Sequence, residues 1–214
     1  MGEHFDALPF VFMKTSVMTK LAVDIVLLPD EAMNESAIAA NAELVKSCAS
    51  EIVLNKNNCL PHISLAMGCI NRNDVAQIGE SLTAILTSVP KKLKPEGMQK
   101  NISSSGQIVS VIQVQRTNKL QKLHEKICRL VKPYFSYDVT GEMTAGGQAS
   151  DSMLQWIKNY PEKASYSNFL PHITIGYGDL PEIKLPAEFA VSRLAICHLG
   201  NHCTCREIIW SLNI

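Results

Sequence analysis

A nine-residue segment that occurs twice places the strongest constraint on the fold of this chain. Residues 60–68 read LPHISLAMG and residues 170–178 read LPHITIGYG. Five of the nine positions are identical, and three more exchange Ser for Thr, Leu for Ile and Ala for Gly. Both copies are rich in apolar and β-branched residues, which is typical of a buried strand. The repeat therefore predicts two related halves with one such strand in each.

The alternation of side chains along a strand places residues i and i+2 on the same face. Each copy is thus expected to present a histidine, a hydroxyl residue and a small residue to one groove, where the small residue leaves room between the strands. These residues are His62, Ser64 and Ala66 in the first copy and His172, Thr174 and Gly176 in the second. The same alternation predicts that Met67 and Tyr177 point into the core.

Two imidazoles that face each other across a groove can share acid–base catalysis. Histidine has an unperturbed pKa of about 6.5, so near neutral pH one ring can accept a proton while the other donates one. The Ser64 and Thr174 hydroxyls can donate hydrogen bonds to the non-bridging oxygens of a phosphoryl group. These groups can cleave a phosphodiester without a metal. Because the two motifs are alike, they do not tell which histidine is the acid.

These motifs resemble the H-x-[S/T]-h signature of the two-histidine (2H) phosphoesterases, where h is apolar. This superfamily comprises 2′,5′ RNA ligase-like proteins and cyclic nucleotide phosphodiesterases. The matching tetrapeptides are HISL at 62–65 and HITI at 172–175, each preceded by proline. The resemblance implies an α+β, bilobal fold in which two antiparallel sheets, backed by outer helices, enclose a central cleft. It implies one domain over 1–214, with intertwined lobes roughly at 20–106 and 107–214.

The resemblance also implies a function. Members of the superfamily cleave or form cyclic or 2′-linked phosphodiesters of nucleotides and short oligonucleotides. Carried over to this chain, His62 and His172 are the catalytic pair, Ser64 and Thr174 bind the substrate, and no metal or other cofactor takes part. The expected activity is a metal-independent phosphodiesterase. Two alternatives stay open: a ligase that joins RNA ends through a 2′,5′ linkage, and a catalytically silent protein that binds nucleotides or RNA ends.

Composition limits which binding partners and which cellular compartment are expected. The formal net charge is zero, whereas proteins that bind long nucleic acids are usually basic, so a small substrate is favoured. The apolar run 21–28 contains Asp24 and is too short to span a membrane. Seven cysteines without a secretory signal pattern predict free thiols and a cytoplasmic location. No protein partner can be inferred.

Hydrophobic patterns and turn residues predict the remaining elements. Strands are expected at 21–28, 52–54, 63–67 and 108–114, with a terminal hairpin of 190–199 and 204–212. Helices are expected from Asn34 or Ser36 to 50, from a capping box of Asp74 and Gln77 to 89, from 117 or 118 to 132, and over 151–156. Residues 90–106 are expected to form a loop or short strand ends, and 138–150 a loop. The segment 134–168 is left unassigned, as a lid or substrate loop.

Several side chains allow more than one interpretation. The tail places Cys197, His198, His202, Cys203 and Cys205 within nine residues, which permits a zinc site, although free cysteines packed in a hairpin are favoured over it. The lysines of 91–94 can contact phosphates, but a solvated loop is favoured. Aromatic residues in irregular segments are candidates for stacking on a base; they are Phe10, Phe12, Trp156, Tyr160 and Tyr166. His4, His124 and His198 are interpreted as surface or packing residues.

Overall fold

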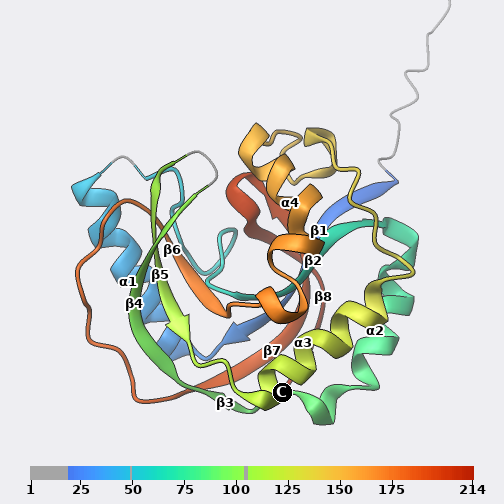
Figure 1. Cartoon of the computed structure of the whole chain (residues 1–214), viewed down its shortest axis with the longest axis horizontal. Helices are drawn as coiled ribbons and strands as arrows, with labels where there is room; N and C mark the ends of the chain where they lie inside the picture. The colour runs from blue at the N-terminus through green and yellow to red at the C-terminus, as the bar shows by residue number, and fades with distance from the viewer. Residues whose placement is uncertain (1–18, 49, 104–105) are drawn as a thin grey trace, which may run out of the picture.

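A computed structural model of the chain describes residues 19–48, 50–103 and 106–214. They form an α+β fold with two antiparallel sheets (Figure 1), which confirms the predicted fold class. The larger sheet has the order β2-β1-β7-β3, with β8 also paired to β7, and its strands are β1 (Lys20–Pro29), β2 (Ile63–Asn71), β3 (Lys92–Leu93), β7 (Phe189–Gly200) and β8 (Thr204–Asn213). The smaller sheet has the order β4-β5-β6, with β4 (Pro95–Ile102), β5 (Ile108–Val114) and β6 (His172–Tyr177).

The two repeated segments form β2 and β6, each at the edge of its sheet. β2 pairs only with β1, and β6 pairs only with β5, among the named strands of the described chain. The two edge strands approach each other, so the duplicated motifs meet where the sheets converge. The topology thus brings together histidines that are 110 residues apart in sequence.

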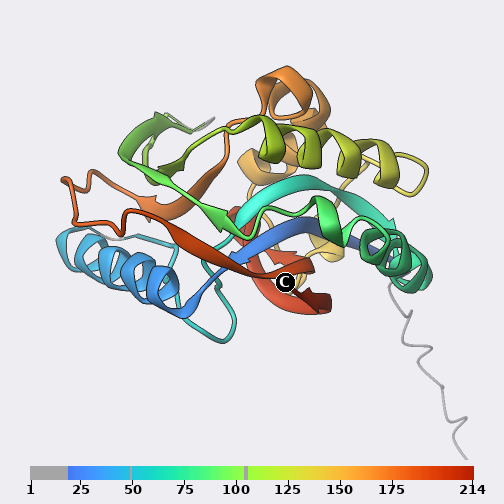
Figure 2. The ribbon, with the colours of Figure 1, turned by 90° about the horizontal axis from the view of Figure 1, so that it is seen from below.

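Two of the four helices in the described chain connect the halves, because each packs on the motif strand of the other half. The helices are α1 (Glu31–Ser47), α2 (Val75–Thr83), α3 (Asn118–Val131) and α4 (Asp151–Lys163). α1, from the first half, packs on β6, whereas α3, from the second half, packs on β2. Figures 1 and 2 show α1 at the opposite end of the molecule from α2. The sheets also mix segments of both halves, since a division near residue 106 falls between β4 and β5, which pair with each other.

One continuous hydrophobic cluster joins both sheets. It includes Ile63 from β2, Ile173 from β6, Leu44 from α1 and Leu120 from α3, all fully buried. Burial of each such side chain stabilises the fold by about 1.5–3 kcal/mol. The motif strands therefore sit on a shared core, which limits how far the two histidines can move apart.

Helix boundaries differ from the predictions where tertiary packing or a different cap decides them. α1 begins earlier than expected because the Asp30 side chain accepts a hydrogen bond from the Met33 amide at 3.0 Å. The predicted Thr117 cap of α3 is confirmed. The predicted capping box at Asp74 is wrong, since no side chain caps α2 there. α4 continues through Pro161 to Lys163 because its buried face packs on β2, which compensates for the proline.

Two segments have a different secondary structure from the one that their composition predicts. Residues 90–106, predicted as a loop or short strand ends, contain the short β3 and the longer β4. β4 is a largely exposed edge strand, so its polar composition reflects contact with solvent. Conversely, residues 52–54 form no strand; their backbone groups bond instead to the buried Asn41 side chain, which supplies the partners that a neighbouring strand would provide.

The tail cysteines correct the expectation of seven free thiols. Cys197 and Cys205 form a disulfide between β7 and β8, with their Cα atoms 5.5 Å apart. The other five cysteines are free. Within the described residues no group of three or more potential metal ligands occurs, so the alternative of a zinc site in the tail has no ligand set there. No helix of the described chain is long and apolar enough to cross a membrane.

Candidate active site

His62 and His172 are held in the same way, each by a carbonyl two residues earlier. The Nδ1 atom of His62 lies 2.8 Å from the Leu60 carbonyl oxygen, and Nδ1 of His172 lies 2.8 Å from that of Leu170. A carbonyl can only accept, so Nδ1 carries the hydrogen in both neutral rings. Each ring is therefore left with Nε2 as its free nitrogen. This atom can accept a proton as a base, or donate one after protonation.

The four residues predicted from the motifs line one cleft of about 560 Å³. His62 and Ser64 contribute from one sheet, and His172 and Thr174 from the other. The volume lies in the range of pockets that hold small ligands. Among the described lining residues, Lys163 is the only lysine or arginine, and none is acidic. The cleft can thus hold a small anion without repulsion, but it lacks a row of cations for a long phosphate backbone.

Both motif strands contain a β-bulge at the same position. Opposite β1, Val26 pairs with Ser64 and Ile25 with Ala66, so Leu65 is the extra residue. Opposite β5, Val111 pairs with Thr174 and Ser110 with Gly176, so Ile175 is the extra residue. A bulge lets two residues of one strand face a single partner and shifts the side-chain alternation beyond it. The repeat in sequence is therefore also a repeat in backbone geometry.

The bulges correct the predicted orientation of the residues that follow. Ala66 and Gly176 do not border the cleft, and Ala66 belongs to the core. Tyr177 lines the cleft, and so does Met67, which is also buried in a second hydrophobic cluster as predicted. Strict alternation predicts the reverse, because it does not include the extra residue.

The absence of a side chain at Gly176 allows α1 to pack closely on β6. A Cβ atom there would lie 2.9 Å from Ser50 Oγ and 3.1 Å from a methyl carbon of Leu44, and the residue has φ +154°. The space that was predicted to lie in the groove is thus occupied by α1 and the segment after it.

A buried asparagine of α1 holds the bulge of the second motif. Asn41 Nδ2 donates to the carbonyl oxygen of Ile175 at 2.7 Å. The same amide group donates to the Ile52 carbonyl at 2.8 Å and accepts from the Leu54 amide at 2.8 Å. Asn41 therefore connects the bulge of motif 2 to the loop that leads into motif 1. Its side chain is 1% exposed, so the loss of these bonds would leave buried backbone groups unpaired.

A buried histidine of α3 performs the equivalent task for the first motif. His124 Nδ1 donates to the carbonyl oxygen of Leu65 at 2.7 Å, and Nε2 accepts from the Tyr166 amide at 2.8 Å. Its ring stacks on Phe169 with centroids 4.0 Å apart. His124 thus connects the bulge of motif 1 to the segment that leads into motif 2, and the interpretation as a packing residue understates this role. Neither Asn41 nor His124 lies in a recognisable motif, so no sequence signal identifies them.

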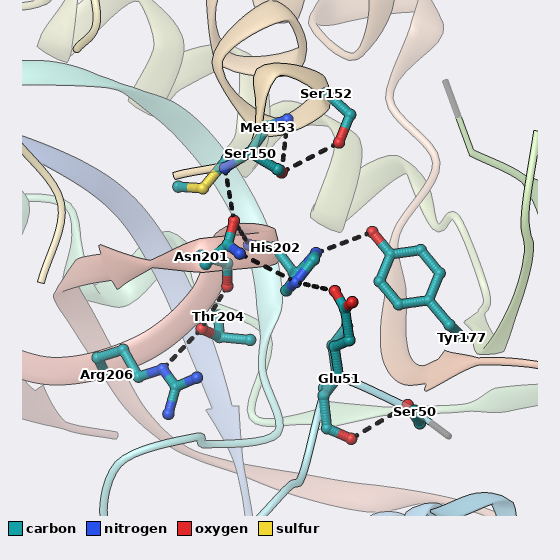
Figure 3. Close-up of polar contacts among 11 residues, drawn as sticks. Ser50, Glu51, Ser150, Ser152, Met153, Tyr177, Asn201, His202, Thr204 and Arg206 are labelled. Atoms are coloured by element: carbon teal, nitrogen blue, oxygen red, sulfur yellow. Dashed lines mark hydrogen bonds and ion pairs between the residues drawn. The ribbon is translucent and has the colours of Figure 1, made fainter. Parts of the chain in front are cut away.

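A third histidine, His202, lines the cleft, and Figure 3 shows its polar contacts. His202, in the turn between β7 and β8, lies with Nδ1 3.2 Å from the Tyr177 hydroxyl and Nε2 2.6 Å from a carboxylate oxygen of Glu51. Asn201 Oδ1 accepts from the His202 amide and from the Ser150 amide, which fixes the turn against the start of α4. His202 therefore connects the Tyr177 hydroxyl to the Glu51 carboxylate, and Asn201 holds the turn in place. The sequence indicates His202 only as a possible zinc ligand of the tail.

Burial sets the charge state of the two motif histidines. It lowers the pKa of both His62 and His172, while the hydrogen bonds to Leu60 and Leu170 act in the opposite direction. Repulsion from His172 lowers the pKa of His62 further, which shows that the rings share one electrostatic environment. Both rings are thus neutral at pH 7 in the empty cleft. An anionic ligand between them would favour the imidazolium form and raise the pKa again.

The other predicted contact residues are only partly at the cleft. Trp156 and Tyr160 line it, together with Phe169, whereas Tyr166 does not. Phe10, Phe12 and His4 lie outside the described residues. The lysines of 91–94 do not line the cleft, and Lys92 forms an ion pair with Glu188 instead. The buried Asp24, which the sequence indicates only as part of a strand, lies beside Ser64 and His62.

Two antiparallel sheets, outer helices and a cleft with one histidine motif from each sheet define a protein with a LigT-like fold. Comparison with solved structures agrees. The chain is similar to TT0787 of Thermus thermophilus, with a TM-score of 0.54, 12% identity and coverage of 90% of this chain and 97% of that one. It is also similar to E. coli LigT in its apo form, with a TM-score of 0.53, 13% identity and coverage of 91% and 98%. No protein-family model matches the sequence, and no curated protein does.

The connection through Asn41 can be tested by its effect on stability. We expect Asn41→Leu to lower the free energy of unfolding by about 2–4 kcal/mol, because three buried backbone groups lose their partner. Asn34→Leu in the same helix is the matched control, since its side chain makes only one long contact of 3.5 Å; it should change the value by about 0.5 kcal/mol or less. Urea unfolding measures both. Equal effects of the two substitutions would contradict this role of Asn41.

The protonation state of His124 makes the free energy of unfolding depend on pH. Burial lowers its pKa in the folded protein below the value of about 6.5 expected on unfolding. The unfolded chain therefore binds more protons, so this contribution is present above about pH 6.5 and is lost as pH falls through the folded-state pKa. We expect the free energy of unfolding to fall between about pH 7 and 5. His124→Gln should show a shallower decline over the same range. An unchanged slope in this variant would show that His124 does not contribute.

Proposed function

We propose that this protein is a metal-independent phosphodiesterase that acts on a cyclic or 2′-linked phosphodiester of a nucleotide or short oligonucleotide. The observation that carries the proposal is the matched pair of imidazoles, each with Nδ1 bonded to its own backbone and Nε2 free, in one cleft. Such a pair provides a base for the attacking hydroxyl or water and an acid for the leaving oxygen. The LigT-like fold supports a reaction of this phosphoesterase type.

Substrate charge has a direct part in this mechanism. The two rings are neutral in the empty cleft because burial lowers both pKa values. A bound phosphodiester monoanion would stabilise one proton on the pair, and this produces the acid and base forms together. Ser64 and Thr174 would donate hydrogen bonds to the non-bridging oxygens, on which charge increases in the transition state. The aromatic residues Trp156 and Tyr160 provide an apolar wall for a base.

The activity can be tested by hydrolysis of a substrate panel in excess EDTA. The panel contains 2′,3′-cyclic mononucleotides, 2′,5′- and 3′,5′-linked oligoadenylates, and cyclic dinucleotides. We expect turnover of at least one cyclic or 2′-linked member, and a loss of about 10²–10⁴-fold in kcat for His62→Ala and for His172→Ala. His198→Gln is the control, because this histidine contacts the Met143 carbonyl outside the cleft. Binding without turnover across the panel would contradict the proposal and favour a silent binding protein.

The hydroxyl groups should act mainly on the chemical step. We expect Thr174→Val to lower kcat by about 10²–10³-fold, the usual effect of removing one donor to a developing oxyanion. Thr174→Ser keeps the hydroxyl and should retain most of the activity. Steady-state kinetics on the best substrate separate kcat from KM. If Thr174→Val raises only KM, the hydroxyl contributes to ground-state binding and its role in the transition state is wrong.

A further inference from the structure

A buried carboxyl group lies behind the hydroxyl of the first motif. Asp24 is in the centre of β1, where it is fully buried between apolar neighbours. It pairs with Met67 beyond the bulge of β2, whereas the equivalent position in the smaller sheet, opposite Tyr177, is Val109. The repeat therefore has a carboxyl group in one half only. This difference separates the two otherwise similar motifs.

The contacts of Asp24 are those of a neutral acid. Its Oδ2 lies 2.5 Å from Ser64 Oγ and 3.9 Å from His62 Nε2. Its Oδ1 is buried and has no hydrogen-bond partner within the described residues. An ionised carboxylate in this place would leave a charged oxygen buried and unpaired, which is strongly unfavourable, whereas the carbonyl oxygen of a protonated acid tolerates this far better.

The groups that surround Asp24 provide no permanent positive charge. His62 faces it from the start of β2, Tyr160 from α4 and Cys203 from the turn after β7. Burial raises the pKa of Tyr160 and of Cys203, so these two groups are neutral. Within the described chain no lysine or arginine forms an ion pair with Asp24. Burial also raises the pKa of Asp24 well above its usual range, and the Ser64 hydroxyl and the nearby backbone of Ala66 only partly oppose this.

We propose that Asp24 is a protonated acid that donates its hydrogen to Ser64 Oγ and so makes the Ser64 hydrogen available to an anionic ligand. A serine hydroxyl has a single hydrogen. If Asp24 is ionised, Ser64 must donate that hydrogen to Oδ2 and presents only lone pairs to the cleft. If Asp24 is protonated, its own hydrogen occupies the short contact, and Ser64 can donate to a phosphoryl oxygen. Thr174 has no such partner within the described residues, so only the first motif depends on a second proton.

The inference rests on the proposed phosphoryl-binding role of Ser64, but its test does not need turnover. Sulfate is a suitable probe, since it is tetrahedral and keeps its charge over the pH range of the experiment. Carboxyl-carbon NMR of Asp24 reports its protonation directly, and isothermal titration gives sulfate affinity. We expect Asp24 to be protonated at pH 7. Asp24→Asn should bind sulfate within about twofold of wild type, because its amide also donates to Ser64 but cannot ionise.

Ser64→Ala tests whether Ser64 connects the protonation state of Asp24 to anion binding. We expect this change to weaken sulfate binding at least about tenfold wherever Asp24 is protonated, and to have little effect at any pH where Asp24 is ionised. In the Asp24→Asn background it should weaken binding at every pH. Thermal unfolding verifies that each variant is folded.

Several results would overturn the inference. They are an ionised Asp24 at pH 7, a folded Asp24→Asn variant that binds sulfate tenfold more weakly, an effect of Ser64→Ala that does not follow the protonation of Asp24, and wild type that does not bind sulfate. Loss of turnover in His62→Ala and His172→Ala is measured separately, so failure of the phosphodiesterase proposal is distinguishable from failure of this one.

Discussion

The arrangement of the cleft depends on one backbone feature, the β-bulge that both motif strands share. The bulges at Leu65 and Ile175 change which side chains border the cleft. They also direct one carbonyl from each motif strand toward a buried polar side chain. A bulge locally interrupts the ladder of a strand, and its unpaired groups need other partners. In this fold, those partners come from the helix that packs on each motif strand.

The partners are reciprocal, and this explains why the halves are intertwined. Asn41 of α1 holds the bulge of β6 and the loop before β2, while His124 of α3 holds the bulge of β2 and the segment before β6. Each side chain thus contacts one motif and the segment that leads into the other. A separate lobe could not supply these bonds for itself, because the helix that carries the donor belongs to the other half. The distance between the two imidazoles is consequently controlled by short, buried hydrogen bonds as well as by the shared core.

The sequence predicts the parts of this structure that are local or repeated. The motif strands, the hairpin of β7 and β8, and helix α3 with its Thr117 cap follow from periodicity and turn residues. The approach of the four motif residues follows from the duplication and the resemblance to a known family. What the sequence could not show depends on register and on tertiary contacts. A bulge leaves no mark on alternation, so strict alternation places Tyr177 in the core, and β4 is polar because it is an exposed edge.

The duplication also leaves two unlike halves of one site. Both motifs have the same backbone geometry, and in both the Nδ1 atom donates a hydrogen bond to the carbonyl two residues earlier. The rings themselves are therefore held in the same way. Their surroundings differ: Tyr177, oriented by His202 and Glu51, lies beside the second motif, whereas Met67 and the buried Asp24 lie beside the first. A symmetric pair of neutral imidazoles has no preferred acid. In the proposed reaction an anionic substrate would place the proton on the pair, and the unequal surroundings would decide which ring keeps it.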